Sequence, residues 1–158
     1  MIEFKDLRAV EPLVQGLQIL NHENADPFDQ LEDPFNYFDP KMEIARILGE
    51  LGDTRAVPAL IAVLKDDYCN NWNYMTRVCA AKALGQLKDE QATYPLIDIL
   101  ENNESEVRRM AAWALGEIKD PRAIEPLLRL MGDEDSIVLE AAQEALSKLR
   151  EAEIKGRQ

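Results

Sequence analysis

The sequence has a single histidine, two cysteines and fewer basic than acidic residues. Lys and Arg number 18 against 30 Asp and Glu, so the formal net charge is −12. Such a chain repels a phosphate backbone and lacks the basic footprint of nucleic-acid binding, so we expect no nucleic-acid partner. His22, the one histidine, has no nucleophile-elbow motif around it. We therefore expect no catalytic residues and no metal site.

Long apolar runs and export signals are also absent. No run approaches the roughly 20 residues that span a bilayer, so we expect no membrane partner. The first residues, Met1 to Asp6, do not form a basic segment followed by an apolar one. Cys69 and Cys79 have no metal-type spacing and form no disulfide framework. These features favour a cytoplasmic location.

What the sequence does contain is an internal repeat. Four segments align without gaps, three of them ending in Leu-Gly: 41–49, 77–85, 108–116 and 139–147. Their last positions lie 36, 31 and 31 residues apart. A second pattern, opened by an aspartate, follows the first three segments at Asp53, Asp89 and Asp120, and a fourth copy begins at Asp6. A fixed period of this length indicates stacked structural repeats.

Both patterns have the spacing of amphipathic helices. Apolar residues recur at three- and four-residue steps, as in Val107, Ala111, Ala114, Leu115 and Ile118. Asp120 is suited to cap the second helix, with Pro121 in its first position. We predict helices at about 6–20, 41–51, 54–65, 75–87, 90–101, 105–118, 121–131 and 136–150. Neither helix of a pair can bury its stripe alone, so the pairs must stack.

The pattern Val-Arg-x-x-Ala-Ala-x-Ala-Leu-Gly, followed by Asp-x-Arg-Ala-x-x-Pro-Leu, resembles the short HEAT-like repeat of phycobilisome lyases. The resemblance implies an all-α, right-handed α-α superhelix of about four repeats, a HEAT-like solenoid in one domain over 1–158. It also implies a ladder in which a basic residue of each first helix pairs with the acid that opens the second. The matching residues are Lys41, Arg77 and Arg108 for the bases and Asp53, Asp89 and Asp120 for the acids.

Two turns of the repeat are enlarged, at about 21–40 and 66–74, by 16 and 5 residues relative to the 31-residue unit. They contain seven of the ten aromatic residues, and 21–40 holds six acids but no Lys or Arg. Insertions of this kind tend to carry function, so we expect an aromatic-acidic edge that binds a partner. Its candidate residues are Phe35, Tyr37, Phe38, Tyr68, Trp72 and Tyr74. Alternatively, 21–40 caps the flank of helix 6–20. A polar tail is expected at about 151–158.

Second helices of such stacks line the concave face, where varied side chains suit partner recognition. Aligned positions there make Tyr94, Asp98, Glu125 and Arg129 further candidates for partner binding. Trp113 stands where the other repeats have Arg46, Lys82 and Glu144, so it is either an exposed anchor or packs over the neighbouring first helix.

We therefore expect a non-catalytic protein–protein interaction or scaffold module, without a cofactor, whose partner is another protein. The alternative from the resemblance is a bilin lyase subunit, or a phycobilisome assembly or degradation factor, that binds a linear tetrapyrrole or a phycobiliprotein. Deoxyhypusine hydroxylase, a HEAT-like di-iron enzyme, uses repeated His-Glu pairs. With one histidine, this chain cannot supply such a ligand set.

Overall fold

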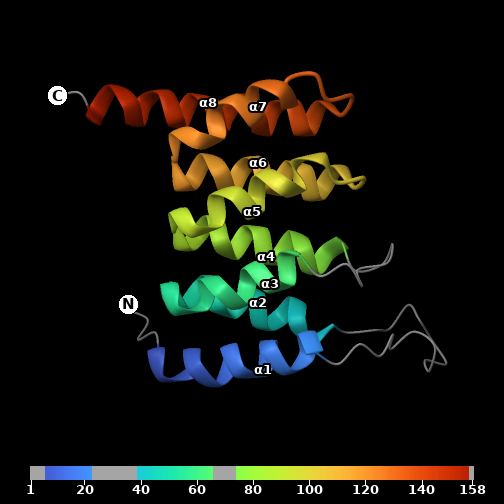
Figure 1. The fold of residues 1–158 in the computed structure, drawn as a ribbon, viewed down its shortest axis with the longest axis vertical. Coiled ribbons are helices and arrows are strands. Elements are labelled where there is room, and N and C mark those ends of the chain that lie inside the picture. The colour runs from blue at the N-terminus through green and yellow to red at the C-terminus, as the bar shows by residue number, and fades with distance from the viewer. Residues whose placement is uncertain (1–5, 23–38, 66–73, 157–158) are drawn as a thin grey trace, which may run out of the picture.

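The computed structural model describes residues 6–22, 39–65 and 74–156, and all regular structure in these residues is helical. Figure 1 shows the helices piled along the long axis of the molecule, with α1 at one end and α8 at the other. First and second helices alternate along the chain and form two layers. The predicted all-α solenoid of HEAT-like repeats is confirmed.

Each second helix opens with a 3₁₀ turn. The four copies are η1 (Leu7–Ala9) with α1 (Val10–His22), η4 (Thr54–Ala56) with α3 (Val57–Leu64), η5 (Glu90–Ala92) with α5 (Thr93–Asp98) and η6 (Ile99–Glu101), and η7 (Pro121–Ala123) with α7 (Ile124–Leu130). Asp6, Asp53, Asp89 and Asp120 cap these turns by accepting the backbone N–H two residues further on. The capping role predicted for Asp120 is confirmed, and the same device starts every second helix.

The first helices are α2 (Pro40–Leu51), α4 (Tyr74–Leu87), α6 (Ser105–Ile118) and α8 (Ser136–Gly156), and each packs on the next. Glycines make the close approach possible. A Cβ added to Gly49, Gly85 or Gly116 would lie 2.8, 2.9 or 2.7 Å from the Cα of an alanine in the following first helix. Those alanines are Ala83, Ala114 and Ala145. The glycine at the end of each of these three Leu-Gly motifs is therefore a contact point between successive repeats.

Helix α8 differs from the other first helices in two ways. It continues to Gly156, so residues 151–156 of the expected polar tail are helical. Its outer face is polar: Gln143 and Ser147 are exposed, whereas Ala112 and Gly116, the aligned residues of α6, are buried. Polar residues at these positions suit a face in contact with water rather than another closely packed helix.

The turns from second to first helices lie along one edge of the stack. Figure 1 places the turns before α6 and α8 at the same edge as the end of α1, the start of α2, the end of α3 and the start of α4. The helix ends that flank both expected insertions therefore share one edge, which we call the turn edge. Two turns along this edge are described in full, at 102–104 and 131–135.

Candidate functional site

The second helices present a continuous exposed surface, which we call the second-helix face. Its aligned positions are Glu11, Gln15, Gln18, Pro58, Ala62, Lys65, Tyr94, Asp98, Glu101, Glu125, Arg129 and Gly132, and all of them are exposed. The intervening residues, such as Leu60, Leu96 and Leu127, are fully buried. The helical period thus places the leucines of each second helix in the core and the aligned positions on the surface, where the residue type can vary.

Tyr94 is the prominent aromatic of this face. It lies in the first turn of α5 with 59% of its surface exposed, and the guanidinium carbon of Arg122 stands 5.0 Å from its ring centroid. Arg122 belongs to η7 of the following repeat, so the contact joins two repeats. An arginine at this distance makes a cation–π interaction and restricts the ring.

Arg122 is held in place by acids. Its Nε donates to Oδ2 of Asp120 at 2.7 Å, and a terminal nitrogen lies 3.7 Å from the carboxylate of Glu90. The hydrogen bond from Arg122 is the main reason that the pKa of Asp120 falls to about 2, with further help from the backbone N–H of Arg122 and the hydroxyl of Thr93. The same carboxylate raises the pKa of Arg122. Arg122 is therefore a permanently charged, positioned neighbour of the Tyr94 ring.

Arg122 is not among the residues predicted from the sequence, although the repeat contains a signal for it. An arginine follows the capping aspartate by two residues in three of the four copies, as Arg8, Arg55 and Arg122. Each of these arginines forms an ion pair with its aspartate. The Asp-x-Arg spacing therefore predicts a turn in which cap and cation are coupled. The repeated arginine is therefore the sequence signal for Arg122, the neighbour of Tyr94.

The remaining candidate residues fall into two groups. Asp98, Glu125 and Arg129 are exposed on the second-helix face with Tyr94. Tyr74 begins α4 at the turn edge, where it is half-buried against the core, so it is not part of that face. Five candidates lie outside the described residues: Phe35, Tyr37, Phe38, Tyr68 and Trp72.

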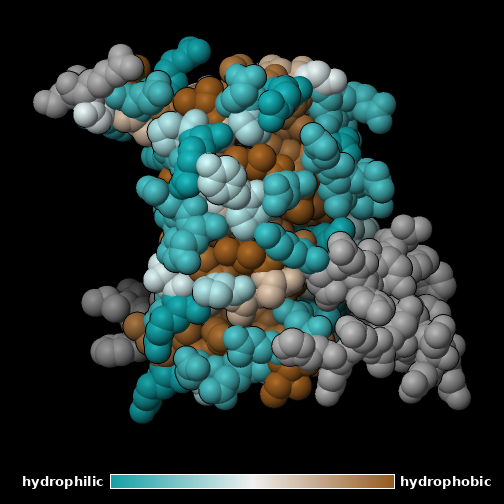
Figure 2. Space-filling model, in the orientation of Figure 1, coloured by the Kyte–Doolittle hydropathy of each residue, from teal (hydrophilic) through white to brown (hydrophobic). Residues whose placement is uncertain are grey.

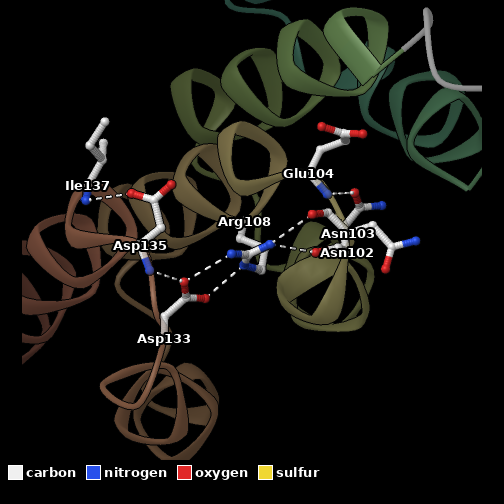
Figure 3. A network of polar contacts seen from close by, with 7 residues as sticks. All are labelled: Asn102, Asn103, Glu104, Arg108, Asp133, Asp135 and Ile137. Carbon is white, nitrogen blue, oxygen red and sulfur yellow. Dashed lines mark hydrogen bonds and ion pairs between the residues drawn. The ribbon is translucent and has the colours of Figure 1, made fainter.

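The turn edge is held together by Arg108, as Figure 3 shows. Its Nε and Nη2 donate to the two carboxylate oxygens of Asp133 at 2.7 and 2.9 Å, while Nη1 donates to the carbonyls of Asn102 and Asn103. The Arg108 contact lowers the pKa of Asp133. The side chains of Arg108 and Asp133 are only 13% and 7% exposed, so the pair ties two turns together rather than facing solvent.

This contact corrects the ladder that the resemblance implied. Arg108 pairs with Asp133, and Asp120 pairs instead with Arg122 of its own turn and accepts a hydrogen bond from Thr93. Asp53 and Asp89 likewise bond within their own turns, to Arg55 and Gln91. The side chain of Arg108 leaves the N-terminal end of α6 next to the turn edge, which explains why it reaches the turn residues on both sides.

Two further side chains are placed in the first-helix layer. Trp113 is partly buried over α4, where its ring would touch a Cβ added to Gly85 at 2.6 Å, so it packs over the neighbouring helix and is not an exposed anchor. Cys79 is half-buried, and burial raises the pKa of its thiol, which disfavours the reactive thiolate.

Two open hollows flank Asn103 along the turn edge, with volumes of about 490 and 510 Å³. Polar and charged side chains predominate in their walls, including Glu104, Glu134 and Asp135 in one and Asp98 and Glu101 in the other. Within the described ranges, no group of three or more His, Cys, Asp or Glu residues is arranged to hold a metal ion. No helix of the described chain has the length and apolar character that a bilayer crossing requires.

Solved structures with this architecture include two that cover most of the chain. A complex of CpcE and CpcF of phycocyanin lyase from Nostoc sp. PCC7120 superposes with a TM-score of 0.71 and 26% identity over 97% of this chain and 57% of the other. Human deoxyhypusine hydroxylase in complex with glycerol superposes with a TM-score of 0.66 and 26% identity over 92% of this chain and 47% of the other. This chain thus spans about half the length of either.

Sequence comparison points to the same group. Deoxyhypusine hydroxylase of Rattus norvegicus is 33% identical over 78 residues, which cover 44% of this chain and 25% of the relative. The HEAT repeats family matches residues 28–104 and, overlapping them, 67–147. These matches include all four first-helix segments and agree with the stacked helical pairs of the structure. The chain belongs to the HEAT repeat family.

Proposed function

We propose that this chain is a non-catalytic protein-interaction module that binds a partner protein on its second-helix face. The observation that supports the proposal best is the Tyr94–Arg122 pair, an exposed aromatic ring held in place on an exposed face. Tyrosine is enriched at the energetic centres of protein interfaces, because it offers a large contact area at a low cost in conformational entropy.

The composition of the face agrees with this role. Acidic, basic, aromatic and small side chains alternate over it, and Figure 2 shows polar side chains spread over the stack with hydrophobic ones visible between them. Leu128 of α7, which is 51% exposed, adds an aliphatic contact on the same layer. A mixed surface with a few large apolar residues is typical of non-obligate interfaces.

Capture from the native host, followed by quantitative mass spectrometry, tests the proposal. The bait is the full chain in wild-type form, as the double variant Tyr94→Ala plus Leu128→Ala, and as the control Gln143→Ala, which changes an exposed residue of the first-helix layer. We expect a reproducible partner that the double variant loses and the control retains. Capture of the same proteins by all three baits contradicts the proposal, provided that thermal melting shows all three to be folded.

The aromatic-acidic edge is proposed as a second contact for the same partner. The variant Trp72→Ala plus Phe35→Ala should weaken capture and leave the melting temperature nearly unchanged. If the melting temperature falls strongly instead, these side chains stabilise the stack and the capping role of 21–40 is favoured.

A bilin lyase subunit or a related phycobilisome factor is the second candidate, and the likeness to the CpcE–CpcF complex supports it. The hollows of the turn edge are open and mostly polar, and they lack the apolar enclosure typical of small-molecule sites. Binding of a phycobiliprotein therefore agrees better with this candidate than binding of free bilin. Titration with phycocyanobilin and with a phycocyanin subunit separates the two. A changed visible spectrum indicates chromophore binding, and association with the phycocyanin subunit without a spectral change indicates protein binding. If the spectrum does not change and the subunit does not associate, the candidate is ruled out.

A further inference from the structure

Acidic residues of the first helices α2 and α6 differ in their ion pairs from those of the second-helix face. All four glutamates of α2 and α6 form ion pairs: Glu43 and Glu50 with Arg46, Glu106 with Arg109, and Glu117 with both Lys88 and Lys148. On the second-helix face, Asp98, Glu101 and Glu125 have no ion pair among the described residues. The acids of α2 and α6 are therefore neutralised within the stack, whereas these three acids of the second-helix face are available to a partner.

These acids surround Tyr94 along the chain and across repeats. Asp98 follows Tyr94 by four residues on α5, which places the two on the same side of the helix. Glu125 takes the position of Tyr94 in the next repeat, three residues after Arg122. Both acids are exposed. A ring and at least one carboxylate are thus offered together to an approaching group.

The cation already beside the ring does not cancel this charge. Arg122 pairs with Asp120 and lies 3.7 Å from Glu90, so this group of three charges is net negative. Arg129 and Lys65 are exposed bases of the same face, and they are outnumbered by the exposed acids Glu90, Asp98, Glu101 and Glu125. The net charge of −12 for the whole chain adds long-range attraction for a cation.

We infer that the Tyr94 region of the second-helix face binds a basic, lysine- or arginine-bearing segment of the partner protein. A cationic side chain stacks on the exposed surface of the Tyr94 ring and pairs with Asp98 or Glu125. The ring surface attracts cations electrostatically, as its contact with Arg122 shows, and unpaired carboxylates next to it provide the charge-assisted hydrogen bonds. This inference rests on the proposed function and specifies the chemistry of its partner.

A short, fluorescein-labelled peptide of alternating Ser and Arg is a suitable probe. Fluorescence anisotropy compares it with the same peptide carrying citrulline, which keeps the shape of arginine without the charge, and with one carrying Glu. We expect binding of the Arg peptide alone, with an affinity that falls as the salt concentration rises. In an NMR titration, the largest amide shifts should map to Tyr94, Asp98 and Glu125.

Variants test the individual contributions. Tyr94→Ala should weaken binding of the Arg peptide roughly tenfold, as removal of a central interface aromatic does. Tyr94→Phe, which retains the ring, should bind within about twofold of wild type. The pair Asp98→Asn plus Glu125→Gln should weaken binding and flatten its salt dependence, while Gln143→Ala should leave both unchanged.

Several results would overturn the inference. Equal binding of the citrulline peptide, an unchanged affinity in Tyr94→Ala, or shifts that map to the first-helix layer each contradict it. These failures differ from failure of the proposed function. If the captured partner still depends on Tyr94 and Leu128 but the Arg peptide does not bind, the face is an interface for a segment of different chemistry. If neither capture of the partner nor binding of the Arg peptide depends on Tyr94, both proposals fail.

Discussion

The hydroxyl of Thr93, at the start of α5, donates a 2.8 Å hydrogen bond to the carboxylate of Asp120, the cap of η7 in the next repeat. Both residues are buried. Asp120 therefore has two tasks: it caps its own helix through the N–H of Arg122 and joins two successive repeats through Thr93. It also orients Arg122 beneath Tyr94, so the packing of the stack and the shape of the proposed interface depend on the same carboxylate.

The ionisation of Asp120 should make stability depend on pH. Its pKa is about 2 in the folded chain against an ordinary value of 3.8, so the folded state binds this proton less tightly than the unfolded state. The stabilisation, about 2 kcal/mol, is present above about pH 4 and is lost as the pH falls from about 4 to about 2. Urea unfolding of wild type and Asp120→Asn along this pH range measures it. The difference in the free energy of unfolding between wild type and Asp120→Asn should decrease as the pH falls. A difference that stays constant would contradict a paired carboxylate.

The Gly85 contact should be intolerant of a methyl group. In Gly85→Ala the new Cβ would meet Ala114 and Trp113 at 2.9 and 2.6 Å, so α4 and α6 must separate or Trp113 must move. We expect a loss of about 1–3 kcal/mol in the free energy of unfolding, as for other overpacked cores. Gly16→Ala is the matched control, because its Cβ would have an ordinary contact of 3.9 Å with Ile44 in a helix that alanine favours. A stable Gly85→Ala chain would show that the first helices are not packed this closely.

The Arg108–Asp133 pair should contribute far more than a surface pair of the same type. Arg108→Met leaves a nearly buried carboxylate without its main partner and should cost about 3 kcal/mol. Arg8→Met removes a bidentate contact with Asp6 that is largely exposed, and should cost less than about 1 kcal/mol. Thermal melts of both variants compare them. Similar losses for the two would show that the turn edge does not depend on Arg108.

The repeated residues are the part of the sequence from which the fold could be predicted. Ala-Leu-Gly and Asp-x-Arg recur because the glycine allows close packing and the aspartate starts a helix, so helices and their stacking could be predicted from spacing alone. The partner of Arg108 could not be predicted in this way, because Asp133 lies in a turn outside the aligned patterns. Trp113 is a similar case: a large ring in a polar column can point outward or sideways, and only the space over Gly85 decides.

The candidate site was predictable in outline. Aligning the second helices identified Tyr94, Asp98, Glu125 and Arg129 as members of one face, because the helical period alone determines which positions avoid the core. It did not identify Arg122 as the neighbour of Tyr94, since that contact crosses from one repeat to the next and depends on how the repeats are stacked. Contacts within a repeat follow from periodicity, whereas contacts between repeats require the structure.

Isothermal titration of the captured partner into wild type, Tyr94→Ala and Gln143→Ala tests the central claim most directly. If the second-helix face is the interface, Tyr94→Ala should bind roughly tenfold more weakly, while Gln143→Ala matches wild type. Equal affinities for all three folded proteins would place the interface elsewhere on the stack.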